Sequence, residues 1–232
     1  MEIDLLQLPV EVMLVLDAQE LYRFYHANDD EVRALRGVSL AIEAGEMVAL
    51  VGPSGSGKTT LLMCLAGLDE PDGGIVKVMG SAMTRRPECE KTRLRLKHLG
   101  VLRQKDNLFQ HLTVLENVLL AQSLCDMPDL GEAAMILSHL GMTARTVSLP
   151  AQLSGGEQAR AGIAVALICQ PEILLLDEPT GETDADSEAA ILSLLTDFRR
   201  GGGSIIVATH NQAVARAATR TLAMQDGKIL DG

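Results

Sequence analysis

The stretch Gly52-Pro53-Ser54-Gly55-Ser56-Gly57-Lys58-Thr59-Thr60 sets the architecture of this 232-residue chain. Residues 47–51 before it are apolar and predict a strand, and residues 61–66 after it predict a buried helix. The G-x-x-x-x-G-K-[ST] pattern requires this context of strand, glycine-rich loop and helix. Glycines let successive N–H groups point at a polyphosphate, and the helix N-terminus adds a positive dipole end. A Gly-Ser turn that happens to precede a lysine is the alternative, but the flanking elements favour a nucleotide-binding loop.

Polar residues follow other apolar runs of the chain. Gln104 ends the run that starts at residue 100, Asp177 and Glu178 follow 173–176, and His210 ends 204–210. In open α/β sheets the carboxyl ends of the strands form the ligand crevice. These side chains and the glycine-rich loop should therefore converge on one nucleotide.

The residue types at this crevice predict ATP and Mg²⁺ as ligands. Lys58 is expected to reach the β- and γ-phosphates, while the Thr59 hydroxyl and the Asp177 carboxylate are expected to hold Mg²⁺. Glu178 is placed to polarise the attacking water. A solvated turn carboxylate is the alternative for Glu178, and the four apolar residues before Asp-Glu-Pro argue against it.

The composition limits the classes of partner. Hydrophobic residues make up 47% of the chain, and the formal net charge is −11. An acidic chain with two tyrosines, three phenylalanines and no tryptophan lacks the basic groove and stacking platforms of a nucleic-acid binder. We expect no nucleic-acid partner.

The four cysteines, Cys64, Cys89, Cys125 and Cys169, are scattered and contain no C-x-x-C pair. Reduced thiols are the default expectation for a cytosolic protein, and no zinc-type site is expected. No apolar run approaches the roughly 18 residues needed to span a bilayer, and no signal peptide is recognisable. Any membrane role is expected to come through a partner.

The remaining pattern predicts alternating strands and helices with an all-helical middle segment. Thr113 and Glu116 form a possible capping box, and Gly141 is a natural helix stop. Strands are predicted near 14–25, 35–42, 75–78, 100–104, 173–176, 204–210 and 221–224. Helices are predicted near 88–98, 113–124, 130–140, 153–168, 184–200 and 212–219.

From Met13 to the C-terminus the chain resembles the ATP-binding cassette (ABC) ATPases, because Leu-Ser-Gly-Gly-Glu-Gln at 153–158 precedes the Asp-Glu-Pro motif. The resemblance implies head-to-tail pairing of two cassettes, in which Ser154, Gly155 and Gly156 of one chain close over the γ-phosphate held by the other. Ser154 as the N-cap of its own helix is the plainer alternative, and the two roles are compatible.

The resemblance also assigns further site residues. Tyr25 is implied to stack on adenine, with Tyr22 and Phe24 as rivals. Gln104 is implied to sense Mg²⁺ and couple to the helical subdomain, and His210 to contact the γ-phosphate. This chain departs from the family pattern in four places: Arg103 before Gln104, Val165 in the signature helix, Glu182-Thr183 after the Asp-Glu-Pro motif, and Asn211 after His210.

The subgroup that the chain resembles comprises the macrolide-exporter, lipoprotein-release and cell-division cassettes, which serve a separate integral membrane permease at the inner face of the cell membrane. We predict one α/β domain over 13–232, with a P-loop NTPase core, an N-terminal antiparallel β portion and an inserted α-helical subdomain at about 104–162. Residues 1–12 are an extension of unassigned role, and Met1 or Met13 could be the start.

The expected function is Mg²⁺-dependent ATP hydrolysis by a homodimeric transporter or mechanical-exporter subunit. A regulatory cassette in which ATP only drives dimerisation is one alternative. The other is a soluble cassette protein that acts on ribosomes or DNA, which would usually carry a tandem second cassette or a long coiled-coil insertion.

Overall fold

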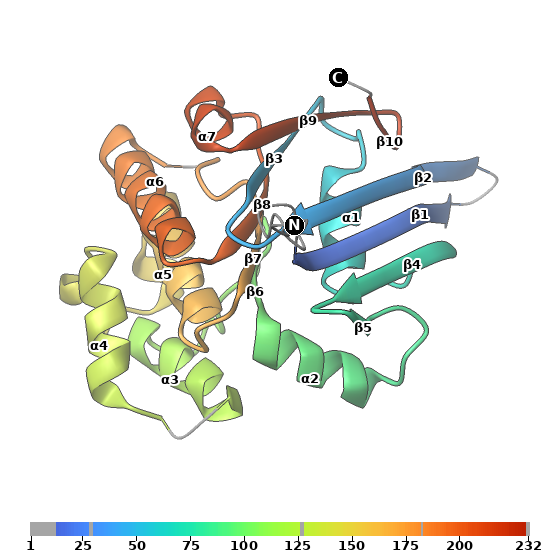
Figure 1. Cartoon of the computed structure of the whole chain (residues 1–232). Helices are drawn as coiled ribbons and strands as arrows, with labels where there is room; N and C mark the ends of the chain where they lie inside the picture. The colour runs from blue at the N-terminus through green and yellow to red at the C-terminus, as the bar shows by residue number, and fades with distance from the viewer. Residues whose placement is uncertain (1–12, 28–29, 126–127, 182, 231–232) are drawn as a thin grey trace, which may run out of the picture.

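Two β-sheets pack on either side of helix α1 (Lys58–Leu65), the helix that follows the glycine-rich loop (Figure 1). The structure is a computed structural model that describes residues 13–27, 30–125, 128–181 and 183–230. The antiparallel sheet has the order β2-β1-β4-β5, with β1 at Leu14–Ala27, β2 at Asp30–Glu43, β4 at Gly73–Val78 and β5 at Ser81–Ala82.

The second sheet has the order β10-β9-β3-β8-β7-β6, and all neighbouring pairs except β10–β9 are parallel. Its strands are β3 (Met47–Val51), β6 (Leu99–Leu102), β7 (Ile173–Asp177), β8 (Ser204–Ala208), β9 (Arg220–Gln225) and β10 (Lys228–Ile229). The P-loop α/β core with an N-terminal antiparallel portion is therefore confirmed.

The central strands of the parallel sheet are apolar on both faces. Val48 and Leu50 of β3 pack into a core shared with α1 and the antiparallel sheet. Met47 and Ala49 of the same strand pack into a second core on the opposite face. Such continuous apolar runs are typical of strands buried between two layers, which is why 173–176 and 204–208 could be recognised as strands.

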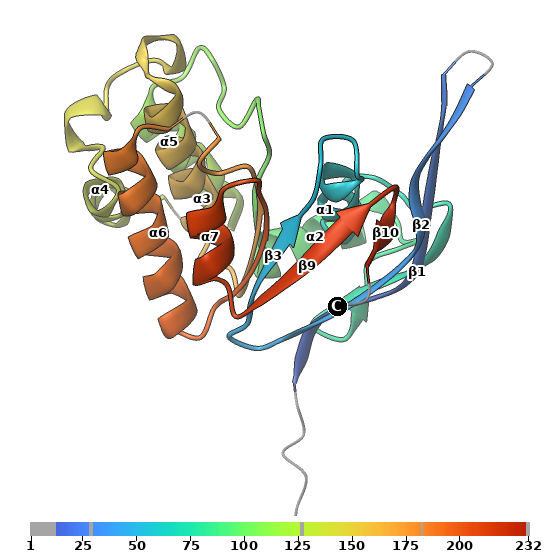
Figure 2. The ribbon, with the colours of Figure 1, turned by 90° about the horizontal axis from the view of Figure 1, so that it is seen from above.

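Helices α3 (Val114–Cys125), α4 (Leu130–His139) and α5 (Gly155–Leu167) come between β6 and β7 and contribute to this second core. Short 3₁₀ turns at Thr143–Arg145 and Pro150–Gln152 connect α4 to α5. Helices α6 (Ala185–Arg200) and α7 (Gln212–Ala217) lie on the same side of the sheet, away from the β1–β2 hairpin (Figure 2). The inserted helical segment is confirmed.

Side-chain caps begin several of these helices. Thr113 and Glu116 exchange hydrogen bonds at the start of α3, so the predicted capping box is confirmed. Ser154 and Glu157 form a second box at α5, and Asp184 caps α6 through the Ser187 N–H at 2.7 Å. Helix α2 (Glu88–His98) has the predicted bounds.

Several predicted boundaries were wrong. β6 ends two residues before Gln104, and β8 ends two residues before His210, so both side chains lie on loops rather than at strand ends. The two-residue strand β5 was not predicted. Residues 1–12 and Glu182 lie outside the described residues. No helix in the described part of the chain has both the length and the hydrophobicity to cross a membrane.

The expectation of four reduced thiols was also wrong for two of them. Cys125 and Cys169 form a disulfide, while Cys64 and Cys89 are free. The two partners are 44 residues apart in sequence, and no local pattern signals their proximity.

Candidate functional site

The carboxyl ends of β3 and β7 open into a cavity of about 1180 Å³. All nine residues of the glycine-rich loop, 52–60, line it, and so do Tyr25, Gln104, Asp177, Glu178, His210 and Gly155. The structure thus brings together the residues that were predicted to converge. Ser154 and Gly156 are not among the lining residues.

The glycine-rich loop curls around the Lys58 side chain. Lys58 Nζ donates to the carbonyl oxygens of Gly52 at 2.8 Å and Pro53 at 3.0 Å, which holds the ammonium group over the loop. Gly57 precedes α1 with a φ of 101°, where an L residue would be strained, and a Cβ there would collide with the Ala34 carbonyl oxygen. The loop therefore combines a fixed cation with the open N-terminus of α1, which suits a bound polyphosphate.

Asp177 ends β7 and is only 2% exposed. Burial raises the pKa of its carboxyl group, a shift opposed by the Thr59 hydroxyl and by the charge of Lys58. Its Oδ2 atom is buried without a hydrogen-bond partner among the described residues. A buried carboxylate oxygen without a partner is unfavourable on its own, so this atom is suited to a cation that arrives with the ligand.

Glu178, beside Asp177, lies in the left-handed region with a φ of 50°, an uncommon conformation that recurs at functional sites. Its N–H donates to the Ala208 carbonyl oxygen at 2.9 Å, which fixes the turn against β8. Glu178 Oε2 lies 2.9 Å from His210 Nδ1. The two predicted catalytic side chains are therefore in direct contact, and His210 remains largely exposed to the cavity at 71%.

The loop after β6 carries more charge than the sequence analysis assigned to it. Gln104 is exposed and lines the cavity together with Arg103 and Lys105. Asn107 ties this loop down, because its side chain accepts from the Arg103 N–H at 2.8 Å and donates to the Arg103 carbonyl at 2.6 Å. Arg103 and Lys105 flank the predicted glutamine directly, so their positive charge could have been inferred from the sequence.

Tyr25 is held by two residues that the sequence analysis missed. Its hydroxyl donates to Asp69 Oδ2 at 2.5 Å, and the guanidinium of Arg23 lies 4.6 Å from the ring centroid. Arg23 also pairs with Asp69 at 2.7 Å. Burial, followed by the Asp69 carboxylate, raises the pKa of the Tyr25 hydroxyl. The Arg23–Asp69 pair thereby fixes the orientation of the ring beside the phosphate loop.

We predict that Asp69→Asn weakens ATP binding while leaving the maximal rate nearly unchanged, because Asp69 positions Tyr25 without touching the phosphates. Loss of an ion pair of this exposure costs about 0.5–1 kcal/mol, so the KM for ATP should rise roughly two- to five-fold. Steady-state kinetics measure the KM for ATP and the kcat separately. Lys77→Gln on β4 is the control, and a lowered kcat with an unchanged KM would contradict the positioning role.

Ser154 begins α5 as one half of a capping box. Its hydroxyl accepts from the Glu157 N–H at 3.2 Å, and Glu157 Oε2 accepts from the Ser154 N–H at 2.8 Å. Arg145 donates to the other oxygen of Glu157 at 2.8 Å. Gly156 lies against Ser187 of α6, so a Cβ there would crowd the start of that helix. The plainer role predicted for Ser154, an N-cap, is therefore present in the structure.

One departure from the family pattern has a structural explanation. The Asn211 side chain accepts from the Ala213 N–H at 2.7 Å as the N-cap of α7, and it donates to Glu188 Oε2 at 2.7 Å. An aspartate could make the first contact but not the second, because it has no proton to donate. Asn211 thus links α7 to α6 beside His210.

A phosphate loop that follows parallel strand β3, with an acidic pair at the end of β7 and a histidine on the loop after β8, is typical of a P-loop nucleotide-binding protein. The family profile described as "ABC transporter" matches residues 35–181. The chain belongs to the ABC transporter family, and its fold is that of the family's ATP-binding cassette.

Two curated relatives represent different lengths of protein. The macrolide export ATP-binding/permease protein MacB of Shigella flexneri is 39% identical over 93% of this chain, which spans only 34% of that relative. The lipoprotein-releasing system ATP-binding protein LolD of Legionella pneumophila (strain Paris) is 37% identical, with 93% of this chain and 97% of the relative covered.

The cassette MJ0796 is similar in structure. Its dimeric structure has a TM-score of 0.90 and 32% identity, covering 93% of this chain and 97% of that one. A second dimeric structure of MJ0796, in a post-hydrolysis state bound to ADP and Pi, has a TM-score of 0.89. The resemblance to the macrolide-export and lipoprotein-release cassettes is therefore confirmed.

Proposed function

We propose that this cassette hydrolyses ATP in an Mg²⁺-dependent reaction and that two copies, joined head to tail, drive a separate membrane permease. The observation that carries the proposal is the arrangement at the end of β7. There, a buried carboxylate oxygen without a partner among the described residues belongs to Asp177, next to a glutamate that contacts a histidine, and these three residues line the same cavity as the phosphate loop.

Phosphate binding would use the nine-residue loop. Lys58 would exchange its contacts with the Gly52 and Pro53 carbonyls for the β- and γ-phosphate oxygens, which are stronger acceptors because they are charged. Gln104, supported by the neighbouring Arg103 and Lys105, would approach the γ-phosphate side from the loop after β6. Tyr25 would present its ring to the adenine.

The residues near β7 fit Mg²⁺. Thr59 offers a hydroxyl, Asp177 a carboxylate whose Oδ2 is free to bind, and Gln104 an amide oxygen; hard oxygen ligands of this kind, together with substrate phosphates, are what Mg²⁺ prefers. When bound, the ion supplies charge neutralisation at the β- and γ-phosphates.

Glu178 would act as the general base. Its carboxylate is held by His210 at 2.9 Å and by the fixed turn after Asp177, so it can accept a proton from a water molecule that attacks the γ-phosphate. His210 would contact the γ-phosphate through its exposed ring. Positioning and electrostatic stabilisation would supply most of the remaining rate enhancement.

We predict that Lys58→Ala weakens ATP binding itself, since the variant loses a cation that faces the phosphates. Hydrogen bonds to charged groups contribute about 1.5–3 kcal/mol, which corresponds to a roughly 10- to 100-fold loss of affinity. Isothermal titration calorimetry with ATP measures the change, with Lys77→Ala as a control of equal charge. Unchanged affinity would overturn the assignment of the phosphate loop.

The proposed partners, a permease and a second copy of the chain, are inferred from the relatives. MacB is an ATP-binding/permease protein and LolD the ATP-binding protein of a lipoprotein-releasing system, and MJ0796 is dimeric. By analogy, this chain would lie in the cytoplasm against the inner face of the membrane, bound to a permease. Its net charge of −11 supports the expectation that it does not bind nucleic acid.

Two measurements test the proposed function. Phosphate release from ATP, with and without Mg²⁺, separates an ATPase from a regulatory cassette that only dimerises. Affinity capture of the native complex should recover an integral membrane protein with the ATPase. ATP binding without turnover, or capture of ribosomes instead of a membrane protein, would favour the alternatives.

A further inference from the structure

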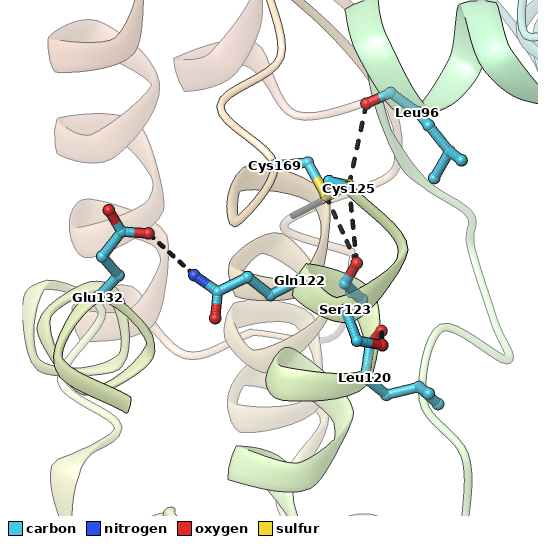
Figure 3. The surroundings of a disulfide bond; sticks show 8 residues. Leu96, Leu120, Gln122, Ser123, Cys125, Glu132 and Cys169 are labelled. Atoms are coloured by element: carbon cyan, nitrogen blue, oxygen red, sulfur yellow. Dashed lines mark hydrogen bonds between the residues drawn. A yellow bond between two sulfur atoms is a disulfide. The ribbon is translucent and has the colours of Figure 1, made fainter. Parts of the chain in front are cut away.

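A disulfide joins Cys125, the last residue of α3, to Cys169, which follows α5 (Figure 3). The Cα atoms of the two residues lie 5.9 Å apart, a separation that a disulfide spans comfortably. Cys125 is exposed and Cys169 is half-buried, so solutes can reach the sulfur atoms. Neither cysteine lines the nucleotide cavity.

The disulfide borders its own groove of about 340 Å³, which is lined by Arg93, Leu96, Lys97, Leu124 and both cysteines. Arg93 and Lys97 are one turn apart on α2 and both are exposed. Within the part of the chain that the structure describes, neither makes an ion pair, whereas Lys91 and Arg95 of the same helix pair with Glu88. The groove therefore combines a disulfide with two cationic side chains that are available to a ligand.

The other two cysteines lack these features. Burial, followed by the nearby Asp69, raises the pKa of the Cys64 thiol to about 12, so it is almost entirely protonated at neutral pH and unreactive. Cys89 is exposed but has no partner. The intramolecular disulfide is thus formed by Cys125 and Cys169.

We propose that Cys125 and Cys169 form a reversible dithiol–disulfide site that exchanges with small anionic thiols of the glutathione class, and that Arg93 and Lys97 bind the carboxylates of the incoming molecule. The two cations raise the local concentration of an anion and of its thiolate. The aliphatic side chains of Leu96 and Leu124 would contact its carbon skeleton.

The exchange balances without any other oxidant or reductant. A thiolate attacks one sulfur of the disulfide, forms a mixed disulfide and releases the other cysteine as a thiolate, which takes up a proton. A second thiolate attacks the mixed disulfide at the sulfur of the small molecule and releases the first cysteine. Two small thiols thereby become one small disulfide, and the protein gains two electrons and two protons.

The surroundings accommodate both redox states. The Ala121 carbonyl oxygen lies 3.6 Å from Cys125 Sγ and 3.5 Å from Cys169 Sγ. The Leu96 carbonyl oxygen lies 3.9 Å from Cys125 Sγ (Figure 3). In the dithiol state these carbonyls can accept the S–H groups, so reduction leaves no thiol without an acceptor.

Oxidation closes a covalent loop over residues 126–168, which contains α4 and the signature helix α5. Closing a loop of this length restricts the unfolded chain, and the oxidised form should therefore melt at a temperature higher by about 5–10 °C. The bond also ties the end of α3 to the end of α5.

The first experiment measures recognition. Oxidised full-length protein is treated with reduced glutathione, which is anionic, or with cysteamine, which is cationic, and free thiols are counted after timed acid quenching. The glutathione-to-cysteamine rate ratio should fall about 3- to 10-fold in Arg93→Gln/Lys97→Gln, and in the native protein when the salt concentration rises from 0.05 to 0.5 M. Using the ratio cancels the intrinsic reactivity of each thiol.

Arg85→Gln/Arg86→Gln removes the same charge from exposed residues outside the groove and should leave the ratio unchanged. An equal ratio in the native protein and in Arg93→Gln/Lys97→Gln would overturn the recognition role of the two cations.

The second experiment tests the site itself. The protein is first fully reduced and freed of reductant. After incubation with oxidised glutathione, peptide mass spectrometry should find Cys125 and Cys169 joined by a disulfide, and the melting temperature should differ between the two redox states. Cys125→Ser and Cys169→Ser should each abolish that difference, and Cys89→Ser should preserve it. Four thiols remaining after oxidation, or equal melting temperatures in both states, would refute the site.

Discussion

Glu178→Gln is expected to abolish turnover while leaving ATP binding intact. The substitution is nearly isosteric and removes only the carboxylate that would accept the proton of the attacking water. General base catalysis contributes about 10²–10⁴-fold, so phosphate release should fall by at least two orders of magnitude. The backbone N–H and the ring of His210, which contact the Glu178 carboxylate in the native protein, can still contact the amide oxygen of the new glutamine. This contact keeps the loop after β8 in place.

Two readouts separate this result from general damage. ATP affinity should stay near that of the native protein, because the Lys58 loop is untouched, and the ATP-bound dimer should persist on a sizing column. Glu90→Gln, which removes an exposed carboxylate of α2, should hydrolyse ATP normally. Near-native hydrolysis by Glu178→Gln would show that another group is the base.

The sequence predicted the parts of the site that local patterns encode. The phosphate loop is contiguous, and its glycines are required by the left-handed backbone at Gly55 and Gly57. Asp177 ends a buried apolar strand, so its position at the carboxyl edge of the sheet followed from the parallel topology. The capping box at Thr113 and the N-cap at Ser154, both predicted, are also encoded over four residues.

Contacts between distant segments could not be predicted in the same way. Arg23 and Asp69 are 46 residues apart, and their pairing depends on how the β1–β2 hairpin lies over the loop after α1. Cys125 and Cys169 meet only because the ends of α3 and α5 pack together. Gln104 and His210 were placed at strand ends, but Arg103 and Thr209 already lie outside β6 and β8, because strand ends are set by pairing rather than by hydropathy.

Ser154 provides the second prediction of large effect, because its two roles separate experimentally. Both Ser154→Ala and Ser154→Arg lose the hydroxyl that caps α5, which should cost about 1 kcal/mol of unfolding free energy in each case. If Ser154 acts only as a cap, the two variants should hydrolyse ATP at similar rates. The pair is therefore a matched test, in which stability is held nearly equal and only side-chain bulk and charge differ.

We expect the two variants to diverge, because in a head-to-tail dimer Ser154 would face the γ-phosphate bound by the partner's phosphate loop. Ser154→Arg should still bind ATP through its own Lys58, yet its bulk should prevent the dimer from closing. Hydrolysis and ATP-driven dimerisation on a sizing column should both be lost, whereas Ser154→Ala should retain measurable activity.

The specific activity of the native protein should also rise with concentration, since each site would be built from two chains. An active Ser154→Arg variant, together with native specific activity that stays constant down to monomeric protein, would contradict the role in trans and leave Ser154 as a helix cap alone.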